Sequence, residues 1–495
     1  MKKLLKICFA FAILFFSFSC EEDFLDKEPS AFLTPEQIAD AAEVKPEILE
    51  STITGAYKLT FTAGTGGTSG HDDFGQKGID IYMDMLCGDM ALSQSLYGWY
   101  RTDITEFKAP LDYTINTGNY VAWRYYYRII RSVNLVIDGL GGNNGNPTTE
   151  KAKAVMGQAK ALRAHSYFYL TQLYQNEYKA DQEILPIYTS LADQNGPKVK
   201  ASVIYDLIVK DLNESIVLLN NFTRANKSQI NKEVAKTILA YALAAKGDYA
   251  GAYTAAKDVI DNGGFTAMRD AELTGGFNQL SSLDWMWGVD LNTETNLGLI
   301  SFWGQIDYYS YSYAGVGDYK AMDANLFAQF PATDKRKAQF NNQPSSATHL
   351  LPLNKFYDAK KVKFGAGTPV QNDIFFYRIS EVHLLAAECA AKSGNEASSK
   401  SILKNFMSLR VTDPSYVDGL SGVQLQNHIY LQTKLELWGE GKSYLAMKRN
   451  KATVTRGANH LSNVGIPIPH NDERLTFEIP NAEIQNNPFI SSQND

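Results

Sequence analysis

The chain has 495 residues, 44% of them hydrophobic, and a formal net charge of −7. No cluster of Lys and Arg stands out along it, which argues against nucleic acid as a ligand. Beyond the N-terminus, no segment approaches the roughly 18 consecutive apolar residues that a membrane-spanning helix needs.

The N-terminus has the pattern of a bacterial lipoprotein signal. Three lysines precede an unbroken apolar run, Ile7–Phe16, which is too short to span a bilayer as a helix. Cys20 follows within a few residues, and an acidic run comes directly after it. We predict that residues 1–19 are removed and that Cys20 carries acyl chains, which anchor a water-exposed body to a membrane. An ordinary secretory signal with a chance cysteine is the alternative.

The first long segment without helical periodicity covers residues 60–120. It is rich in Gly, Asn, Asp and aromatic residues, and Tyr97 and Trp99 lie close together in it. Irregular segments of this length inside a compact domain are usually functional or disordered. The aromatic content argues against disorder, so we expect an ordered insertion.

Apolar periodicity predicts helices in the middle of the chain. Residues 150–174 and 203–219 carry apolar side chains at spacings of three and four, which is the pattern of one helix face. Residues 233–246 and 249–261 form a predicted hairpin, because Gly247 ends the first helix and an aspartate caps the second. The aromatic residues 125–127 and 167–169 are predicted to lie in the core.

A second irregular segment covers residues 263–375. It contains Trp285, Trp287 and Trp303, followed by a run at 308–313 in which tyrosines alternate with serines. This alternation predicts a half-exposed strand with alternate rings on one face.

A second hairpin follows, with helices over 378–392 and 396–410 joined by Gly394-Asn395, and another helix is predicted over 425–448. Alanines near both hairpin turns allow close helix packing, as in tetratricopeptide-type pairs. The predicted fold class is mostly α. Tetratricopeptide-like hairpins form a right-handed superhelical scaffold, with long irregular insertions and minor β structure.

The aromatic residues of the two insertions are the candidate binding residues. Flat rings bind the apolar faces of sugars, and neighbouring polar groups can bind hydroxyls. The alternative is that these rings form a core beneath the insertions. The predicted ligand-binding residues are Tyr97, Trp99, Trp285, Trp287, Trp303 and Tyr309.

No motif of catalysis or metal binding is present. The chain lacks HExxH, GxSxG, P-loop and dinucleotide-binding patterns, so we predict neither catalytic nor metal-binding residues. The His71-Asp72-Asp73 sequence is typical of a solvated turn. Asp80, Asp84 and Asp89 could supply oxygen ligands to a structural calcium ion, but the glycine and spacing of an EF-hand loop are missing. No cofactor is therefore expected.

Two cysteines lie outside the signal and the anchor. Cys87 and Cys389 are far apart in sequence, and neither belongs to a CxxC pair. A single disulfide is one alternative for an exported protein. Two unpaired structural thiols are the favoured one.

The chain resembles the SusD/RagB family of surface lipoproteins. The motifs that carry the resemblance are Ser19-Cys20 followed by acids, Gly157–Ala164 continuing to Tyr174, Arg378–Val382 with Leu384–Glu388, and Glu436–Gly441 with the closing Ile466–Pro469. Arg163 and Glu388 are retained as plausible scaffold pairings. The chain departs from the family pattern at Ser443 and Ala446, where members often have an arginine and an aspartate, so a buried ion pair is expected to be missing there.

The resemblance implies a single unit over residues 20–495, with an N-terminal part over about 20–220 and a C-terminal part over about 221–495. It also implies a non-catalytic nutrient-capture protein, lipid-anchored on the outer face of the outer membrane. Such a protein would bind an oligosaccharide or polysaccharide and deliver it to a SusC-like TonB-dependent transporter. Two alternatives stay open: capture of peptides by the same architecture, and a glycan-degrading enzyme at the surface, which would need two carboxylates at catalytic separation.

Overall fold

The computed structural model describes residues 47–295, 297–364 and 370–494. The predicted signal peptide and the predicted lipid-attachment residue, Cys20, lie outside these ranges. Within them, no helix combines the length and the apolar character needed to cross a bilayer.

The described part of the chain is mostly helical, with short strands between the helices. Its α-helices are α3 (Glu47–Leu59), α4 (Gln76–Leu86), α5 (Arg101–Thr105), α6 (Lys108–Leu111), α7 (Gly118–Gly139), α8 (Glu150–Tyr174), α9 (Ala201–Leu218), α10 (Lys232–Ala245), α11 (Tyr249–Asn262), α12 (Phe302–Ile306), α13 (Tyr313–Val316), α14 (Ala324–Phe327), α15 (Ile379–Lys392), α16 (Glu396–Met407), α17 (Gly422–Glu436), α18 (Lys442–Arg449) and α19 (Asn481–Asn486). The 3₁₀ helices are η2 (Asp270–Thr274), η3 (Lys335–Gln339), η4 (Ser415–Gly419) and η5 (Glu473–Leu475). The strands are β1 (Met90–Gln94), β2 (Glu183–Leu185), β3 (Val199–Lys200), β4 (Trp285–Val289), β5 (Tyr319–Met322), β6 (Ile374–Arg378), β7 (Val454–Thr455) and β8 (Pro467–Ile468).

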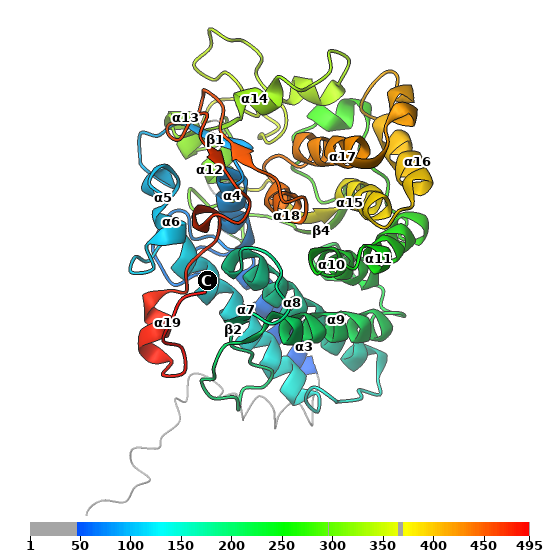
Figure 1. The fold of residues 1–495 in the computed structure, drawn as a ribbon. Coiled ribbons are helices and arrows are strands. Elements are labelled where there is room, and N and C mark those ends of the chain that lie inside the picture. Colours follow the sequence, from blue (N-terminus) through cyan, green and yellow to red (C-terminus); the bar gives the residue numbers. More distant parts are fainter. Residues whose placement is uncertain (1–46, 296, 365–369, 495) are drawn as a thin grey trace, which may run out of the picture.

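The N-terminal helices pack around α8, which contacts α3, α7, α9 and α10 (Figure 1). Helix α8 begins and ends where its periodicity predicts, and nearly all of its side chains are buried. It approaches α9 closely at Gly157, where a Cβ atom would lie 2.8 Å from Leu219 Cγ. Arg163 of α8 forms a two-point ion pair with Asp211 of α9, at 2.8 and 2.9 Å. The predicted scaffold role of Arg163 is therefore confirmed.

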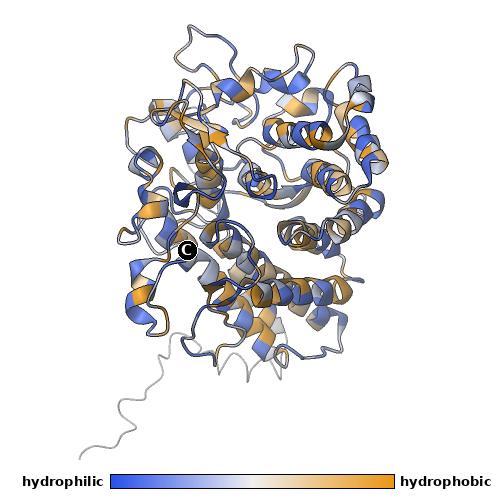
Figure 2. Ribbon diagram, in the orientation of Figure 1, coloured by the Kyte–Doolittle hydropathy of each residue, from blue (hydrophilic) through white to orange (hydrophobic). Residues whose placement is uncertain are grey.

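The two predicted hairpins are present and stack on each other. Helices α10 and α11 form one, α15 and α16 form the other, and α11 packs against α15 (Figure 1). Asp248 caps the second helix of the first hairpin, as its sequence predicts, and Asn395 of the predicted turn caps the second helix of the other. Helix α17 extends the stack next to α15. Orange and blue residues alternate along these helices in Figure 2, as expected for helices that bury one stripe.

The predictions for two other segments were wrong. Residues 60–120 are not irregular throughout, because α4 lies within them and is buried along its whole length. The single helix predicted over 425–448 is divided into α17 and α18. The break comes at Gly439 and Gly441, which have φ values of 82° and 74°. Such left-handed backbone ends a helix and is tolerated mainly by glycine.

Short antiparallel strand pairs join segments that lie between the helices. The pairs are β1 with β5, β2 with β3, β4 with β6, and β7 with β8. Pairing of β4 with β6 places Trp285 opposite Arg378, at the entrance to α15. Pairing of β1 with β5 joins segments that are more than 200 residues apart in sequence, since Met90 lies opposite Met322.

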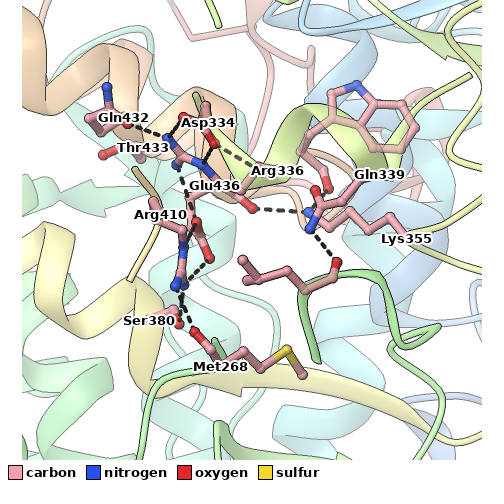
Figure 3. A network of polar contacts seen from close by, with 12 residues as sticks. Met268, Asp334, Arg336, Gln339, Lys355, Ser380, Arg410, Gln432, Thr433 and Glu436 are labelled. Carbon is pink, nitrogen blue, oxygen red and sulfur yellow. Dashed lines mark hydrogen bonds and ion pairs between the residues drawn. The ribbon is translucent and has the colours of Figure 1, made fainter. Parts of the chain in front are cut away.

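A buried network of charges fixes η3, α15 and α17 to one another. It contains four cations and four carboxylates: Arg336, Lys355, Arg378 and Arg410 with Asp284, Asp334, Glu436 and Glu440. Figure 3 shows Glu436 between the guanidinium groups of Arg336 and Arg410. Because the charges balance and their hydrogen bonds are made, the network can remain ionised without water.

Glu388 and the two cysteines were also predicted to have structural roles. Glu388 pairs with Arg449 at 2.8 Å, which confirms its scaffold role. Cys87 and Cys389 are both buried and free, so they do not form a disulfide.

Candidate ligand-binding site

The residues of one exposed aromatic cluster come from both insertions. The imidazole of His71 and the indole of Trp99 are stacked, with centroids 4.8 Å apart and planes within 5° of parallel. Tyr313 packs edge-on against His71 and against Tyr97, at 5.7 and 5.3 Å. Its hydroxyl group is hydrogen-bonded to Nδ1 of His71 at 2.6 Å.

Two further rings extend this cluster at the surface. Tyr311 and Phe364 are in contact at 6.4 Å, and Phe364 packs next to α13, which contains Tyr313. Tyr97, Tyr311 and Phe364 are 61%, 51% and 42% exposed. Exposed aromatic residues gathered in this way are typical of binding surfaces. We call His71, Tyr97, Trp99, Tyr311, Tyr313 and Phe364 the aromatic surface.

Hydrogen bonds from the β1–β5 pair hold the aromatic surface in place. Asp318, directly before β5, accepts hydrogen bonds from the backbone amides of Leu96 and Tyr97. Gln305 donates to the carbonyl oxygen of His71 at 2.7 Å and accepts a hydrogen bond from Lys320 of β5 at 2.8 Å. The rings are thus supported by buried polar groups, as a preorganised binding site requires.

A pair of buried carboxyl groups lies next to His71 in the fold. The hydroxyl oxygen of Tyr82 is 2.6 Å from Asp72 Oδ2 and 2.5 Å from Asp103 Oδ2. The single proton of the Tyr82 hydroxyl can be donated to only one of the two carboxyl groups at a time. Burial raises the pKa of Asp103 to about 6 and also raises the pKa of Asp72. Both carboxyl groups are buried.

The predicted binding residues are divided between surface and core. Tyr97 and Trp99 belong to the aromatic surface. Trp285, Trp287 and Trp303 are at most 1% exposed, so the expectation that their rings face a ligand does not hold in this fold. Trp285 packs against Phe375, and Trp287 stacks on Tyr377. Strand β4 places both tryptophans between the helices and the insertion, where they stabilise the core.

Tyr309 is half-buried and lies apart from the aromatic surface. Its ring contacts are with Tyr308 and Tyr357, at 5.5 and 6.4 Å. The strand predicted over 308–313 is wrong. Asp307 accepts hydrogen bonds from the backbone amides of Tyr309 and Ser310, which makes a turn that leads into α13.

The sequence prediction missed four residues of the aromatic surface that the fold brings together. His71 has the sequence context of a solvated turn. Tyr311 and Tyr313 lie in the aromatic run at 308–313, from which only Tyr309 was predicted to bind a ligand, and Phe364 had no signal beyond the general aromatic content of its segment. The stacking partner of Trp99 therefore could not be identified from sequence spacing.

The structure also tests whether the carboxylates near residue 80 form a cation site. No group of three or more His, Cys, Asp or Glu side chains among the described residues has an arrangement that could hold a metal ion. Asp80, Asp84 and Asp89 are buried, and both carboxyl oxygens of Asp84 lack a hydrogen-bond partner.

Two family models match the chain. Residues 23–246 match a family described as starch-binding and associating with the outer membrane, and residues 328–495 match the SusD family. Together the matches cover most of the chain. A curated relative, SusD-like protein P25 of Formosa agariphila, is 26% identical over 172 residues. That alignment covers 33% of this chain and spans only 28% of the relative's length.

Solved structures share the fold along nearly the whole chain. A SusD-like carbohydrate binding protein from Bacteroides vulgatus has a TM-score of 0.75 at 21% identity, covering 90% of this chain and 96% of the other. A SusD superfamily protein from Bacteroides thetaiotaomicron has a TM-score of 0.72 at 23% identity, covering 91% and 99%. Surface glycan-binding protein A from the same species, solved in complex with laminarihexaose, has a TM-score of 0.67 at 14% identity, covering 90% and 99%.

Proposed function

Because the chain belongs to the SusD family, whose members are glycan-binding proteins associated with the outer membrane, we propose that it captures oligosaccharides on its aromatic surface. The capture is non-catalytic, and the bound glycan passes intact to a SusC-like TonB-dependent transporter. Acyl chains on Cys20 hold the protein on the outer face of the outer membrane, beside that partner.

The stacked pair of His71 and Trp99 is the observation that carries the binding proposal. A stack of two parallel rings with exposed tyrosines beside it offers flat apolar faces and polar edges together. Sugar rings have the matching arrangement, with apolar C–H faces and hydroxyl groups around the rim. The hydrogen bonds from Asp318 and Gln305 fix these rings before a ligand arrives, which lowers the entropy lost on binding.

The proposal is tested by calorimetry with a panel of neutral oligosaccharides. We expect at least one of them to bind, and we expect Trp99→Ala to weaken its affinity by about tenfold or more, because the stacking face is removed. Tyr416→Ala is the matched control, since Tyr416 is a partly exposed ring on a different segment.

Equal affinity of Trp99→Ala and the unmodified protein would place the glycan elsewhere. If no glycan binds and peptides bind clearly, the result would favour peptide capture. Release of reducing ends by the purified protein would show catalysis. Copurification of the transporter with the intact protein from membranes tests the delivery step, and its absence would contradict that step.

A further inference from the structure

A concave site separate from the aromatic surface lies on the N-terminal half of the molecule, between α7, the loop at 188–195 and α19. The cavity has a volume of about 460 Å³, which is within the usual range for small-molecule sites. It shares no residue with the aromatic surface. We call it the α7 cavity.

Three arginines of α7 line this cavity. Arg124, Arg128 and Arg131 follow one another at helical spacing and are all exposed. Sequence inspection suggested no basic stripe, but α7 produces one, because its helical turns align cations that aromatic residues separate in sequence. None of the three forms an ion pair with a carboxylate among the described residues. Arg124 donates to the hydroxyl of Tyr120 and Arg128 to the carbonyl of Thr65, at 3.4 and 2.7 Å.

Two carboxylates also line this cavity, and both accept hydrogen bonds from uncharged donors. Asp193 accepts hydrogen bonds from the backbone amides of Thr189 and Ser190, at 2.6 and 3.0 Å. Glu483 accepts from the indole of Trp123 and from the amide of Asn487, at 3.3 and 2.9 Å. The positive charge of the arginines is therefore available to a ligand.

Aromatic rings form the floor of the cavity. Trp123 packs against Tyr127 with ring centroids 4.9 Å apart, and Tyr127 meets Tyr188 edge-on at 5.7 Å. Tyr120 lines the same space. The arginines can therefore bind a charged group of a ligand, while the rings that line the same cavity can stack on its apolar face.

The loop at 188–195 forms one wall of the cavity, and hydrogen bonds to α7 and α8 hold it in place. Asp138 of α7 accepts hydrogen bonds from the hydroxyl of Ser190 and the amide of Leu191, at 2.9 and 2.8 Å. Asn134 donates to the carbonyl of Tyr188, and the buried Arg163 donates to that of Thr189, each at 3.0 Å. The wall is therefore formed before any ligand binds.

From these observations we infer that the α7 cavity is a second saccharide site, which takes a sugar ring bearing an anionic group. A uronate carboxylate and a sulfate ester share the required chemistry, because both accept charge-assisted hydrogen bonds from guanidinium groups. The ring of the same sugar unit would pack on Trp123, Tyr127 and Tyr188. The inference goes beyond the proposed function, because a different cavity and a different ligand charge are involved.

The test is calorimetry on the full chain with three probes of equal length: a galacturonate tetrasaccharide, a sulfated galactose tetrasaccharide and an uncharged galactose tetrasaccharide. We expect one or both anionic probes to bind, more weakly as salt is raised. The double variant Arg124→Gln/Arg131→Gln should lower that affinity by about tenfold or more, because charged hydrogen bonds are lost. Arg128 is left unchanged because it holds the backbone at Thr65.

Two controls separate this site from the aromatic surface. Arg269→Gln removes one charge from an exposed arginine elsewhere and should leave anionic binding unchanged. Trp99→Ala should also leave it unchanged, while weakening neutral glycans. Unfolding curves that superimpose on that of the unmodified protein would show that the variants are folded.

Binding of the anionic probes by the double variant with unchanged affinity would overturn the inference, and so would failure of both anionic probes to bind. Preference for an acidic peptide over both anionic saccharides would overturn the assignment to a sugar. Each of these results leaves the proposed function of the aromatic surface unaffected.

Discussion

Glu436 and Asp84 are both buried carboxyl groups, but their surroundings act on them in opposite directions. Glu436 accepts hydrogen bonds from Arg336, Arg378 and Arg410. Asp84 forms no ion pair with a cation among the described residues and lies on α4, which packs against α18. On α18, Ser443 and Ala446 stand where family members often have charges, and both are fully buried. Because neither side chain is charged, these two positions supply no cation to pair with Asp84.

We expect Glu436→Gln to lower the free energy of unfolding by about 3–5 kcal/mol, since it leaves buried arginines without their anion. Although burial raises it, Arg410 and Arg378 lower the pKa of Glu436 well below its ordinary value of 4.5. The stability from this group is therefore present above pH 4.5 and is lost as the pH falls below it. Denaturant unfolding at several pH values should show the difference from the unmodified protein shrinking in acid. Glu294→Gln, at an exposed position, should have no such effect.

Asp84→Asn should have the opposite effect. Burial, together with Asp89 and Asp80, raises the pKa of Asp84 well above its ordinary value of 3.8, and the backbone amide of Gly441 offsets this only in part. The folded protein keeps a proton that the unfolded chain releases, so stability declines as the pH rises from 3.8 towards the folded-state pKa.

The Asn variant is expected to gain about 1 kcal/mol or more at neutral pH, with little change in acid. Thermal unfolding over this pH range measures it, with Asp206→Asn, an exposed position, as control. A loss of stability at neutral pH would mean that ionised Asp84 has a stabilising partner.

The burial of individual aromatic residues in the insertions could not be predicted from the sequence. Trp99 and Trp287 both lie in aromatic segments without helical periodicity, yet Trp99 is partly buried and Trp287 is fully buried. The difference arises because β4 pairs with β6, which puts Trp287 against Tyr377. Strand partners distant in sequence give no local signal, so burial could not be predicted from composition.

Among the elements, the hairpins were predictable because their signals are local. Apolar spacing, alanines near the turns, glycine at the helix end and a capping side chain all lie within one short segment. Helix α4 differs from the hairpins: Gln76, Asp80 and Asp84 form a polar stripe at helical spacing, but this stripe is buried like the apolar face. The break between α17 and α18 is marked locally by Gly439 and Gly441, but glycines alone do not show whether a helix ends there. In the fold, Phe356 approaches Gly439 from a distant segment.

We expect Gly439→Ala to lower the free energy of unfolding by about 2 kcal/mol. A Cβ atom at this position would lie 2.6 Å from Phe356 Cε2, and φ is 82°, where side chains other than glycine are strained. Gly419→Ala is the control, because its Cβ would meet open space, and we expect a change within about 0.5 kcal/mol. Equal denaturation midpoints for the two variants would contradict this account of the break.

At the scale of the whole molecule, the predicted fold class and family were confirmed by the structure and the comparisons. The location of the aromatic surface could be predicted only in part. Its residues lie between 71 and 364, and the β1–β5 pair brings their segments together. Tyr97 and Trp99 were found because aromatic density marks an insertion, whereas His71 became part of the site only through the fold.

The predicted lipid anchor leads to an experiment on intact cells. Cys20→Ala should bind the same glycan in solution with unchanged affinity, because the aromatic surface lies far along the chain from residue 20. The variant should be lost from the cell surface, since it lacks the acyl chains. Surface labelling and membrane fractionation measure this. Retention of the variant in the outer membrane would contradict the anchor.

The hydrogen bonds that Asp318 accepts from the amides of Leu96 and Tyr97 also have a consequence for the order of folding. The atoms they join are separated by more than 220 residues, so the loop that contains Leu96 and Tyr97 gains its support only after most of the chain has been synthesised and has collapsed. An exported chain that is truncated or misassembled would still contain Trp99 but would not hold it against His71. Glycan binding therefore reports completed maturation of the protein, and a secreted pool that failed to bind would consist of immature molecules.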